Sequence, residues 1–329
     1  MSVVRKLLFS LVAVALFFGV AEAVLRATAG EVDTSQARFE HTTVYWVSDP
    51  GLDDEPMSHR EMATTFPVST DANGLRAADH RVEKDPNVFR IMMLGCSTTF
   101  GWGVKDDETV PAQLEQALRE RGYDGVEVIN AGQPGYTSFQ GLWLWDQVLH
   151  EYDPDLVVLG FVVQDARRAA YSDLEQALLQ GDQQFLKHNV LWNIALYRLM
   201  KATIDGIRVE TKEREQDSGE GVYRVSEEDY LDHLRTLSAR AGSVGAEVVL
   251  FGFPLERVGY TEAHRRLLRL EAEHAGVGHF DPSAEIEAAS RSETLYFERD
   301  RGHANAAGCK LIGQLFADYL ASSGLLPKA

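Results

Sequence analysis

Between residues 89 and 323, short apolar runs alternate with longer stretches in which apolar residues recur at helical spacing. Short runs of this kind are typical of buried strands, and the longer periodic stretches are typical of amphipathic helices. The expected strands are residues 89–95, 126–130, 155–161, 246–252 and 277–280. The expected helices are residues 109–121, 138–150, 226–243, 262–275 and 304–322. Strands separated by helices predict an α/β fold, with a central parallel sheet and helices on both of its faces.

The N-terminal residues 1–30 form a different kind of segment. Arg5 and Lys6 precede an apolar run over residues 7–25. As one transmembrane helix, this run would be about 28 Å long, which is enough to span a bilayer. The alternative is a cleaved signal peptide, because Ala-Glu-Ala at residues 21–23 fits a small-x-small cleavage site. We favour the uncleaved membrane anchor for its length, and both interpretations place the rest of the chain outside the cytoplasm.

Two further segments depart from the alternation of strands and helices. Residues 31–88 lack long periodicity and are rich in Asp, Ser, Thr and His, so we interpret them as a membrane-proximal extension. Residues 172–225 hold an apolar patch at 191–200 and then a polar run, which predicts a helical insertion followed by a mobile loop. The predicted organisation is an anchor or signal peptide over residues 1–30, the extension over 31–88, and a main domain over 89–323 that carries the insertion.

The composition excludes several classes of partner and site. The chain has 32 Lys and Arg residues against 50 Asp and Glu residues, a formal net charge of −18. Such an acidic surface repels a phosphate backbone, so we expect no nucleic-acid partner. Cys96 and Cys309 are the two cysteines, which leaves no disulfide framework and no cysteine-rich metal site. The ten histidines show no metal-binding spacing such as His-Glu-x-x-His.

The candidate nucleophile is Ser97, which lies in a turn of small residues directly after the expected strand 89–95. In open parallel sheets, ligands bind outside the carboxyl ends of the strands. A serine hydroxyl needs a base to take its proton, and the base needs a group that orients it. Asp300-x-x-His303 is the best candidate, since the carboxylate can fold back to hold Nδ1–H of the imidazole. Nε2 would then face the serine.

Two loops after other expected strands are candidates for stabilising the oxyanion that forms during acyl transfer. Gly135 lies in the loop 130–137, where a glycine lets a backbone N–H approach a substrate closely. Gln164 follows the strand 155–161 and can donate from its side-chain amide. The loop 130–137 also has the simpler interpretation of an ordinary strand-to-helix turn, and a Gln after a strand indicates nothing by itself.

Together, these segments resemble the SGNH hydrolase superfamily, the GDSL-like lipases and esterases. The first block of that family, Gly-Asp-Ser-x-Thr-x-Gly, is similar to residues 95–101, with Cys96 in place of the usual Asp. The turn at residues 71–76 resembles one found in membrane-anchored members. The other matching positions follow in the order of the family: Gly135 in the second block, Gln164 and Asp165 in the third, and Asp300 and His303 in the fifth.

The resemblance covers roughly residues 65–323 and implies the SGNH hydrolase fold, a three-layer α/β/α flavodoxin-like sandwich. It implies no metal and no organic cofactor. The implied roles are Ser97 as nucleophile, His303 as base, Asp300 as its orienting group, and Ser97, Gly135 and Gln164 as donors of the oxyanion hole.

The expected function is that of a serine esterase at the cell membrane, outside the cytoplasm. It would hydrolyse an ester or O-acyl group, O-acetyl included, of a small molecule, a glycan or a lipid. Two alternatives stay open: transfer of the acyl group to a surface glycan, and a weak or inactive binding protein. The second rests on Gln164, which replaces the third-block Asn and is one methylene longer. Loss of one oxyanion donor costs about 2.7–4 kcal/mol in the transition state.

Overall fold

The computed structural model describes residues 3–28, 45–59, 61–77, 80–180, 194–197, 199–200, 221–256 and 259–327. The chain divides into two compact units. One unit comprises Met1–Val44 and Gln176–Gly219, and the other comprises Tyr45–Glu175 and Glu220–Ala329. We call the second one the sheet unit, because the described strands all belong to it.

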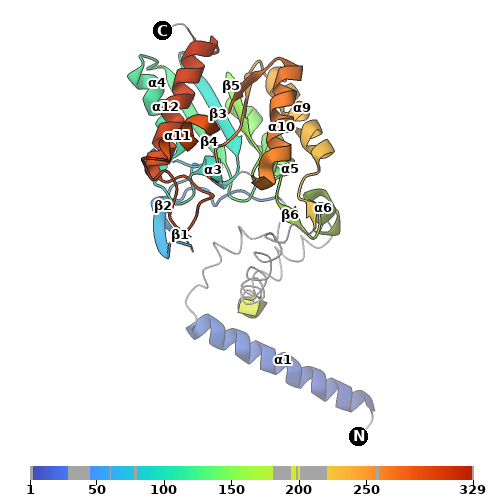
Figure 1. Ribbon diagram of the computed structural model, residues 1–329. Coiled ribbons are helices and arrows are strands. Elements are labelled where there is room, and N and C mark those ends of the chain that lie inside the picture. Colours follow the sequence, from blue (N-terminus) through green and yellow to red (C-terminus); the bar gives the residue numbers. More distant parts are fainter. Residues whose placement is uncertain are drawn as a thin grey trace. The chain divides into compact units, whose positions relative to one another are not determined.

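Five parallel strands form the central sheet of the sheet unit (Figure 1). Neighbouring strands are parallel throughout, in the spatial order β4-β3-β5-β8-β9. Counted along the chain this order is 2-1-3-4-5, which is that of flavodoxin-like folds. The predicted parallel sheet is therefore confirmed. The strands are β3 (Phe89–Gly95), β4 (Val126–Gly132), β5 (Leu156–Gly160), β8 (Glu247–Phe251) and β9 (Gly278–Phe280).

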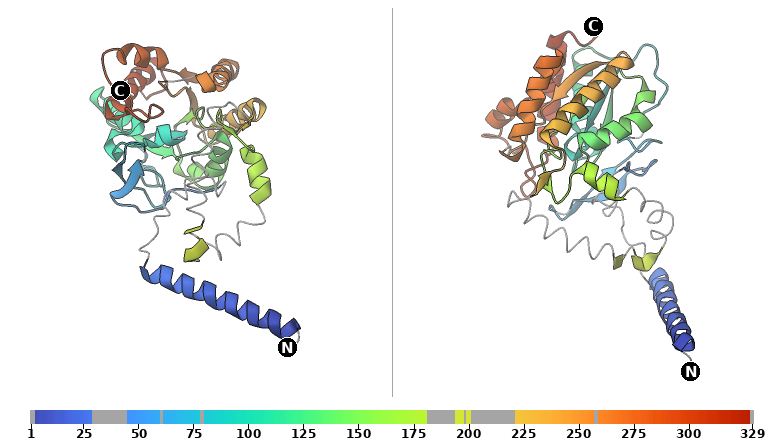
Figure 2. Two further views of the ribbon diagram at one scale, coloured as in Figure 1. Left: turned by 60° about the horizontal axis from the view of Figure 1, so that its bottom comes forward. Right: turned by 90° about the vertical axis from the view of Figure 1, so that its right-hand side faces the viewer.

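Helices cover both faces of this sheet, which makes three layers (Figures 1 and 2). The five predicted helices are present, and α11 is an additional short one. One face carries α4 (Val110–Glu120), α11 (Ser283–Ala289) and α12 (Ala306–Ser323). The other face carries α5 (Ser138–Gln147), α9 (Glu227–Ser243) and α10 (Glu262–Ala275).

The continuous apolar sequence of the strands follows from this layering. On β3, Ile91 and Met93 pack into the core under α4 and α12, whereas Met92 and Leu94 pack into the core under α5 and α9. All four are at most 1% exposed. Successive side chains of a strand point to opposite faces of the sheet. Because helices cover both faces here, these four successive positions are all buried and apolar.

The segment before β3 differs from the extension expected over residues 31–88. From Tyr45 onward it belongs to the sheet unit, and residues 31–44 lie outside the described part of the chain. It contains an antiparallel hairpin of β1 (Glu55–His59) and β2 (Thr64–Val68).

Arg76 fastens this segment to the turn after Ser97. Its guanidinium is fully buried and donates to the carbonyl oxygens of Phe100 at 2.8 Å, Gly101 at 2.6 Å and Val104 at 2.6 Å. The attachment thus uses one cation and several backbone carbonyls. Hydrophobic periodicity does not reveal contacts of this kind.

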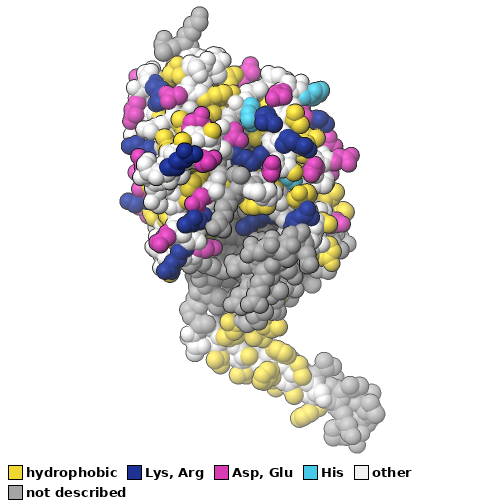
Figure 3. Space-filling view, viewed as in Figure 1, with side chains coloured by type: hydrophobic (Ala, Val, Ile, Leu, Met, Phe, Trp, Pro, Cys, Tyr) yellow, Lys and Arg dark blue, Asp and Glu magenta, His cyan; other side chains and the backbone are white. Residues whose placement is uncertain are grey.

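The N-terminal helix α1 spans Val3–Thr28, in the segment expected to be helical. Apolar side chains are exposed along it (Figure 3). Phe9, Leu16 and Phe17 are among the large ones. In the described part of the chain, no helix combines the length and the apolar character needed to cross a membrane. The predicted transmembrane helix is therefore not confirmed by the structure.

The insertion predicted over residues 172–225 is described only at its two ends. Its first end is α6 (Asp173–Gln180), and its second end is β7 (Val222–Tyr223), which pairs with β6 (Arg168–Ala169). Most of the predicted apolar patch and the polar run lie outside the described residues. On the face drawn in Figure 3, acidic and basic side chains of the sheet unit are interspersed rather than gathered by sign.

Candidate active site

Ser97 lies at the carboxyl end of β3, as the first residue of the four-residue helix α3 (Ser97–Phe100). The turn packs so closely against the ends of β3 and β4 that each strand needs a glycine at its last position. A Cβ at Gly95 would lie 2.1 Å from Oγ1 of Thr99, and a Cβ at Gly132 would lie 2.3 Å from the backbone nitrogen of Phe100. The two glycines therefore let α3 fold directly onto the strand ends, with the Ser97 side chain nearly buried.

Cys96, which stands where the family usually has Asp, precedes this helix with an extended backbone and no capping side-chain hydrogen bond. It is 1% exposed and packs into the apolar core under α4 and α12. Burial raises the pKa of its thiol, so the thiol stays protonated and uncharged. At this position the chain has a packing residue in place of a carboxylate.

The structure brings Ser97, His303 and Asp300 into one relay, although Ser97 and His303 are 206 positions apart in the chain. Oγ of Ser97 lies 2.8 Å from Nε2 of His303, and Nδ1 of His303 lies 2.6 Å from Oδ2 of Asp300. Burial raises the pKa of Asp300, but the contacts with His303 and His59 outweigh burial and hold that pKa well below its usual range. Asp300 is therefore ionised and can hold the imidazole in the orientation that presents Nε2 to the serine.

The turn that carries Asp300 and His303 is fixed at both ends. Oδ1 of Asp300 accepts from the backbone N–H of Gly302 at 3.2 Å. Asn305 then caps α12, its Oδ1 accepting from the backbone N–H of Gly308 at 3.0 Å. The imidazole is thus held between a short side-chain-to-backbone turn and a capped helix start.

The three proposed oxyanion donors lie at the ends of three neighbouring strands. The backbone N–H of Ser97 is in the first turn of a helix, where no intrahelical acceptor exists. Gly135 has φ of +81°, a left-handed conformation that favours glycine. Gln164 follows β5 and is 7% exposed. No acceptor among the described residues takes the N–H of Gly135 or the side-chain amide N–H groups of Gln164.

Arg224, which sequence reasoning missed, orders two of these donors. Its Nη1 donates to Oε1 of Gln164 at 2.9 Å and to the carbonyl oxygen of Gly135 at 2.8 Å. A guanidinium has donors only, so the oxygen end of the Gln164 amide faces it and the nitrogen end faces away. The only sequence signal for Arg224 was its place near the end of the insertion 172–225.

Asp173 in turn holds Arg224. The two form a bidentate pair, with Nε to Oδ1 and Nη2 to Oδ2 both at 2.9 Å, and each residue is 4% exposed. Oδ2 of Asp173 also accepts from Oγ1 of Thr137 at 2.7 Å. A buried, bidentate pair of this kind fixes the position of the guanidinium. The described ends of the insertion thus support the loops after β4 and β5.

The third-block Asp165 has no direct part in the relay. It is fully buried, and its Oδ1 accepts from the backbone N–H of Ser138 at 2.9 Å, which ties the loop after β5 to the start of α5. Burial raises the pKa of Asp165 to about 6. Its role in this structure is to connect two segments beside the site.

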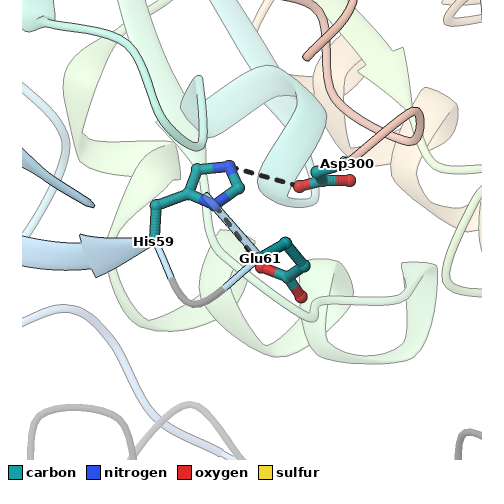
Figure 4. Close-up of side chains that lie close together, drawn as sticks. All are labelled: His59, Glu61 and Asp300. Carbon is teal, nitrogen blue, oxygen red and sulfur yellow. Dashed lines mark ion pairs between the residues drawn. The ribbon is translucent and has the colours of Figure 1, made fainter. Parts of the chain in front are cut away.

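A second histidine, His59 of β1, lies next to the relay (Figure 4). Its Nε2 is 3.3 Å from Oδ2 of Asp300, and its Nδ1 is 3.4 Å from Oε2 of Glu61. These three residues have types and spacings that suit a metal ion. However, each carboxylate faces a different ring nitrogen, whereas a histidine ligand offers one nitrogen to a metal. The arrangement fits an imidazolium between two carboxylates better than it fits one shared ion.

A parallel α/β sheet with a Ser–His–Asp relay at its carboxyl edge is an arrangement that serine hydrolases use. Comparison with known families gives the same class. The chain belongs to the GDSL-like Lipase/Acylhydrolase family, which matches residues 93–311, more than half of the chain. The predicted resemblance to GDSL-like lipases and esterases is therefore confirmed, whereas the match does not include the turn at residues 71–76 that suggested a membrane-anchored member. The hairpin β1–β2, including His59, lies outside the matched residues.

Individual relatives are more distant. An arylesterase from Vibrio mimicus is 34% identical over 79 residues, which are 24% of this chain and 39% of that relative, so the chain spans well under two thirds of it. A solved lipase/acylhydrolase from Enterococcus faecalis has a TM-score of 0.48 at 17% identity, over 73% of this chain and 98% of that one. An acetylxylan esterase from Geobacillus stearothermophilus has a TM-score of 0.46 at 16% identity, over 75% of this chain and 100% of that one.

Proposed function

We propose that this protein is a serine esterase that hydrolyses a carboxylic ester or O-acyl group through an acyl-serine intermediate. The observation that carries the proposal is the contact of Ser97 Oγ with His303 Nε2 at 2.8 Å, with Asp300 on the other ring nitrogen at 2.6 Å. Membership of the GDSL-like lipase and acylhydrolase family supports ester hydrolysis. The local similarity to an arylesterase supports it over a shorter stretch.

The relay supplies each proton transfer of the reaction. Oγ of Ser97 attacks the acyl carbon while Nε2 of His303 takes the hydroxyl proton, and the ionised Asp300 stabilises the imidazolium that forms. The tetrahedral intermediate then expels the alcohol, which takes that proton from Nε2. A water molecule attacks the acyl-serine in the second half, again losing its proton to His303. Release of the acid returns the proton to Ser97.

The oxyanion of each tetrahedral intermediate would accept from the backbone N–H groups of Ser97 and Gly135 and from Nε2 of Gln164. Support for the third donor comes from Arg224, which occupies the oxygen end of the Gln164 amide at 2.9 Å. The extra methylene relative to Asn lengthens the side chain, and the arginine fixes where that longer side chain points. Gln164 is thus proposed to act as a working donor, rather than as a sign of a decayed site.

The test uses the purified full chain with aryl acetate and aryl butyrate, and a fluorophosphonate that labels activated serines. Wild type is expected to cleave at least one ester and to be labelled, and Ser97→Ala is expected to lose both properties. The matched control is Ser322→Ala, an exposed serine at the end of α12. Unchanged cleavage by the Ser97→Ala protein overturns the proposal, and so does a folded wild-type protein that neither cleaves nor labels.

Transfer of the acyl group to a glycan is distinguished by its product. With a labelled aryl acetate, hydrolysis gives free acetate whether or not a sugar is present. If the label appears on an added oligosaccharide at the expense of free acetate, the protein is a transferase that uses the same relay.

We also propose that residues 1–30 hold the protein at a membrane, with the sheet unit outside the cytoplasm. The support is the basic pair Arg5 and Lys6 before a long apolar run, and the exposure of Phe9, Leu16 and Phe17 on α1 at 73%, 63% and 69%. Fractionation of cells that carry the full chain or a chain without residues 1–30 tests this. Recovery of the full chain in the soluble fraction after an alkaline wash overturns it.

A further inference from the structure

His59 is built into the site by a segment that the family match does not include. It is 1% exposed, and aromatic rings enclose it at centroid distances of 5.2 Å for Phe297, 6.3 Å for Trp102 and 6.4 Å for Phe66. A Cβ at Gly103 would lie 2.7 Å from Cδ2 of the His59 ring. The imidazole is therefore held in one place, and its polar atoms have few directions in which to find partners.

The charged groups nearest to its two ring nitrogens are two carboxylates, one on each side, and neither contact has the geometry of a hydrogen bond. A neutral imidazole carries a lone pair on one nitrogen, and a negatively charged carboxylate oxygen would lie only 3.3 or 3.4 Å from that unprotonated nitrogen. Protonation removes this repulsion. Burial lowers the pKa of His59, but Asp300 and Glu61 outweigh burial and raise that pKa to about 9. Glu61 lies in the loop between β1 and β2, and its side chain is 49% exposed.

We propose that His59 is a positioning residue of the esterase site, which as an imidazolium shares Oδ2 of Asp300 with His303 and sets the pH at which the relay becomes active. This inference rests on the proposed function. The two histidines contact the same oxygen, His303 at 2.6 Å and His59 at 3.3 Å. The hairpin β1–β2 thereby becomes part of the active site.

The charges around the relay determine in which direction His59 shifts the pH at which His303 can act as a base. Asp300 faces His303 and His59, and His59 faces Asp300 and Glu61, while the neighbouring Arg301 pairs with Glu256 at 3.0 Å. When His303 is protonated, two imidazolium ions lie beside the carboxylate of Asp300. The repulsion between these like charges disfavours protonation of His303. His59 therefore keeps the base available at lower pH. Glu61 opposes that effect, because it compensates the charge of His59.

Two substitutions are consequently expected to shift activity in opposite directions. His59→Gln removes the positive charge, so the acidic limb of the kcat/KM profile for an aryl ester moves to higher pH by about 0.5 to 1 unit. In Glu61→Gln the remaining carboxylate, Asp300, still favours the imidazolium of His59 at the acidic pH of the limb. The charge of His59 is then uncompensated, so the limb moves to lower pH by a comparable amount. The matched controls are His274→Gln and Glu273→Gln, both exposed on α10, and neither is expected to shift the limb.

A merely structural role would lower kcat at every pH and leave the limb in place. Shifts of both variants in the same direction, or no shift in Glu61→Gln, overturn the proposal. Since Glu61 is half exposed, its substitution keeps the test open even if His59→Gln fails to fold.

A second measurement does not depend on esterase activity. Histidine ring ¹⁵N NMR of the Ser97→Ala full chain, with His59→Gln used to assign the signal, reports the protonation of His59 directly. Both ring nitrogens of His59 are expected to stay protonated at pH 7.5. A neutral ring at that pH overturns the inference whether or not an ester is cleaved, whereas an inactive wild type with a protonated His59 overturns only the proposed function.

Discussion

Arg224 holds Gln164 by the oxygen of its amide, at 2.9 Å from Nη1. The same nitrogen also donates to the carbonyl oxygen of Gly135, so one guanidinium orders the loops after β4 and β5. Since Arg224 is itself fixed by the bidentate contact with Asp173, the three residues form a buried support behind the proposed oxyanion hole. This support holds the side chain of Gln164, which stands where the family usually has Asn, by its amide oxygen.

The Gln164→Glu variant tests the amide donor itself. The carboxylate keeps the size of the side chain and can still pair with Arg224, but it has no N–H to donate. We expect kcat to fall by roughly 10² to 10³, with KM little changed, because the lost hydrogen bond forms mainly in the transition state. Steady-state kinetics with an aryl ester measure this, and Gln116→Glu, on the exposed side of α4, is the control. A fall of less than threefold would exclude Gln164 from the oxyanion hole.

The Arg224→Lys variant tests the support. Lysine keeps a positive charge beside Asp173 but lacks the planar fork that reaches Asp173, Gln164 and Gly135 together. We expect kcat to fall about tenfold to a hundredfold while the protein stays folded. If Arg224 acts through Gln164, the double variant with Gln164→Ala loses less than the sum of the two single losses. Fully additive losses in a double-mutant cycle contradict a shared role.

The raised pKa of Asp165 makes the free energy of unfolding depend on pH. Below pH 3.8 the carboxyl is protonated in the folded and unfolded states alike, whereas its folded pKa is about 6. Between these values the unfolded chain releases the proton first, so the folded state loses stability as pH rises, and the loss is complete above pH 6. Asp165→Asn removes this loss. Its unfolding free energy relative to wild type should therefore rise by up to about 3 kcal/mol between pH 4 and pH 7.

Urea unfolding at several pH values measures the difference, and Asp124→Asn, at an exposed position, is the control. The buried amide that the Asp165→Asn substitution introduces adds a constant cost, so only the change with pH is diagnostic. A difference between this variant and wild type that is flat from pH 4 to pH 7 would contradict the raised pKa.

Gly95→Ala tests the tight turn that presents Ser97. Its Cβ would lie 2.1 Å from Oγ1 of Thr99 and 2.9 Å from Cβ of the same residue, so α3 must move. We expect a lower melting temperature and a fluorophosphonate labelling rate at least tenfold slower than that of wild type. Adding Thr99→Ala removes the closer of the two clashes and should restore part of both. Gly242→Ala, where nothing lies within 4 Å, is the control.

The sequence was sufficient for the sheet and for the relay. The strands are buried on both faces, so their apolar runs stand out, and β3 has the bounds that were expected. Ser97, Asp300 and His303 were found because each sits in a short local motif next to such an element. Local motifs of this kind do not depend on knowing which distant segments meet.

The rest of the site depends on distant contacts between polar residues. Arg224 and Asp173 meet across the insertion, and His59 reaches Asp300 from the other end of the chain. The hairpin β1–β2 was missed because each of its strands has only five residues and few apolar positions, and because the buried cation Arg76 also fastens the segment around it. Hydrophobic patterning does not reveal such pairings, and each became visible only in the folded structure.

The attachment of residues 45–77 by Arg76 bears on how this protein is shortened for study. The family match begins at residue 93, which invites cloning from the strand β3 onward. Such a truncation would remove the guanidinium that binds the carbonyl oxygens of Phe100, Gly101 and Val104. The carbonyl oxygen of Val104 would lose its buried donor, and those of Phe100 and Gly101 would keep only the N–H groups of Asn130 and Val104, close to the turn that carries Ser97. Expression vectors for crystallisation or assay should therefore start no later than Tyr45, where the sheet unit begins.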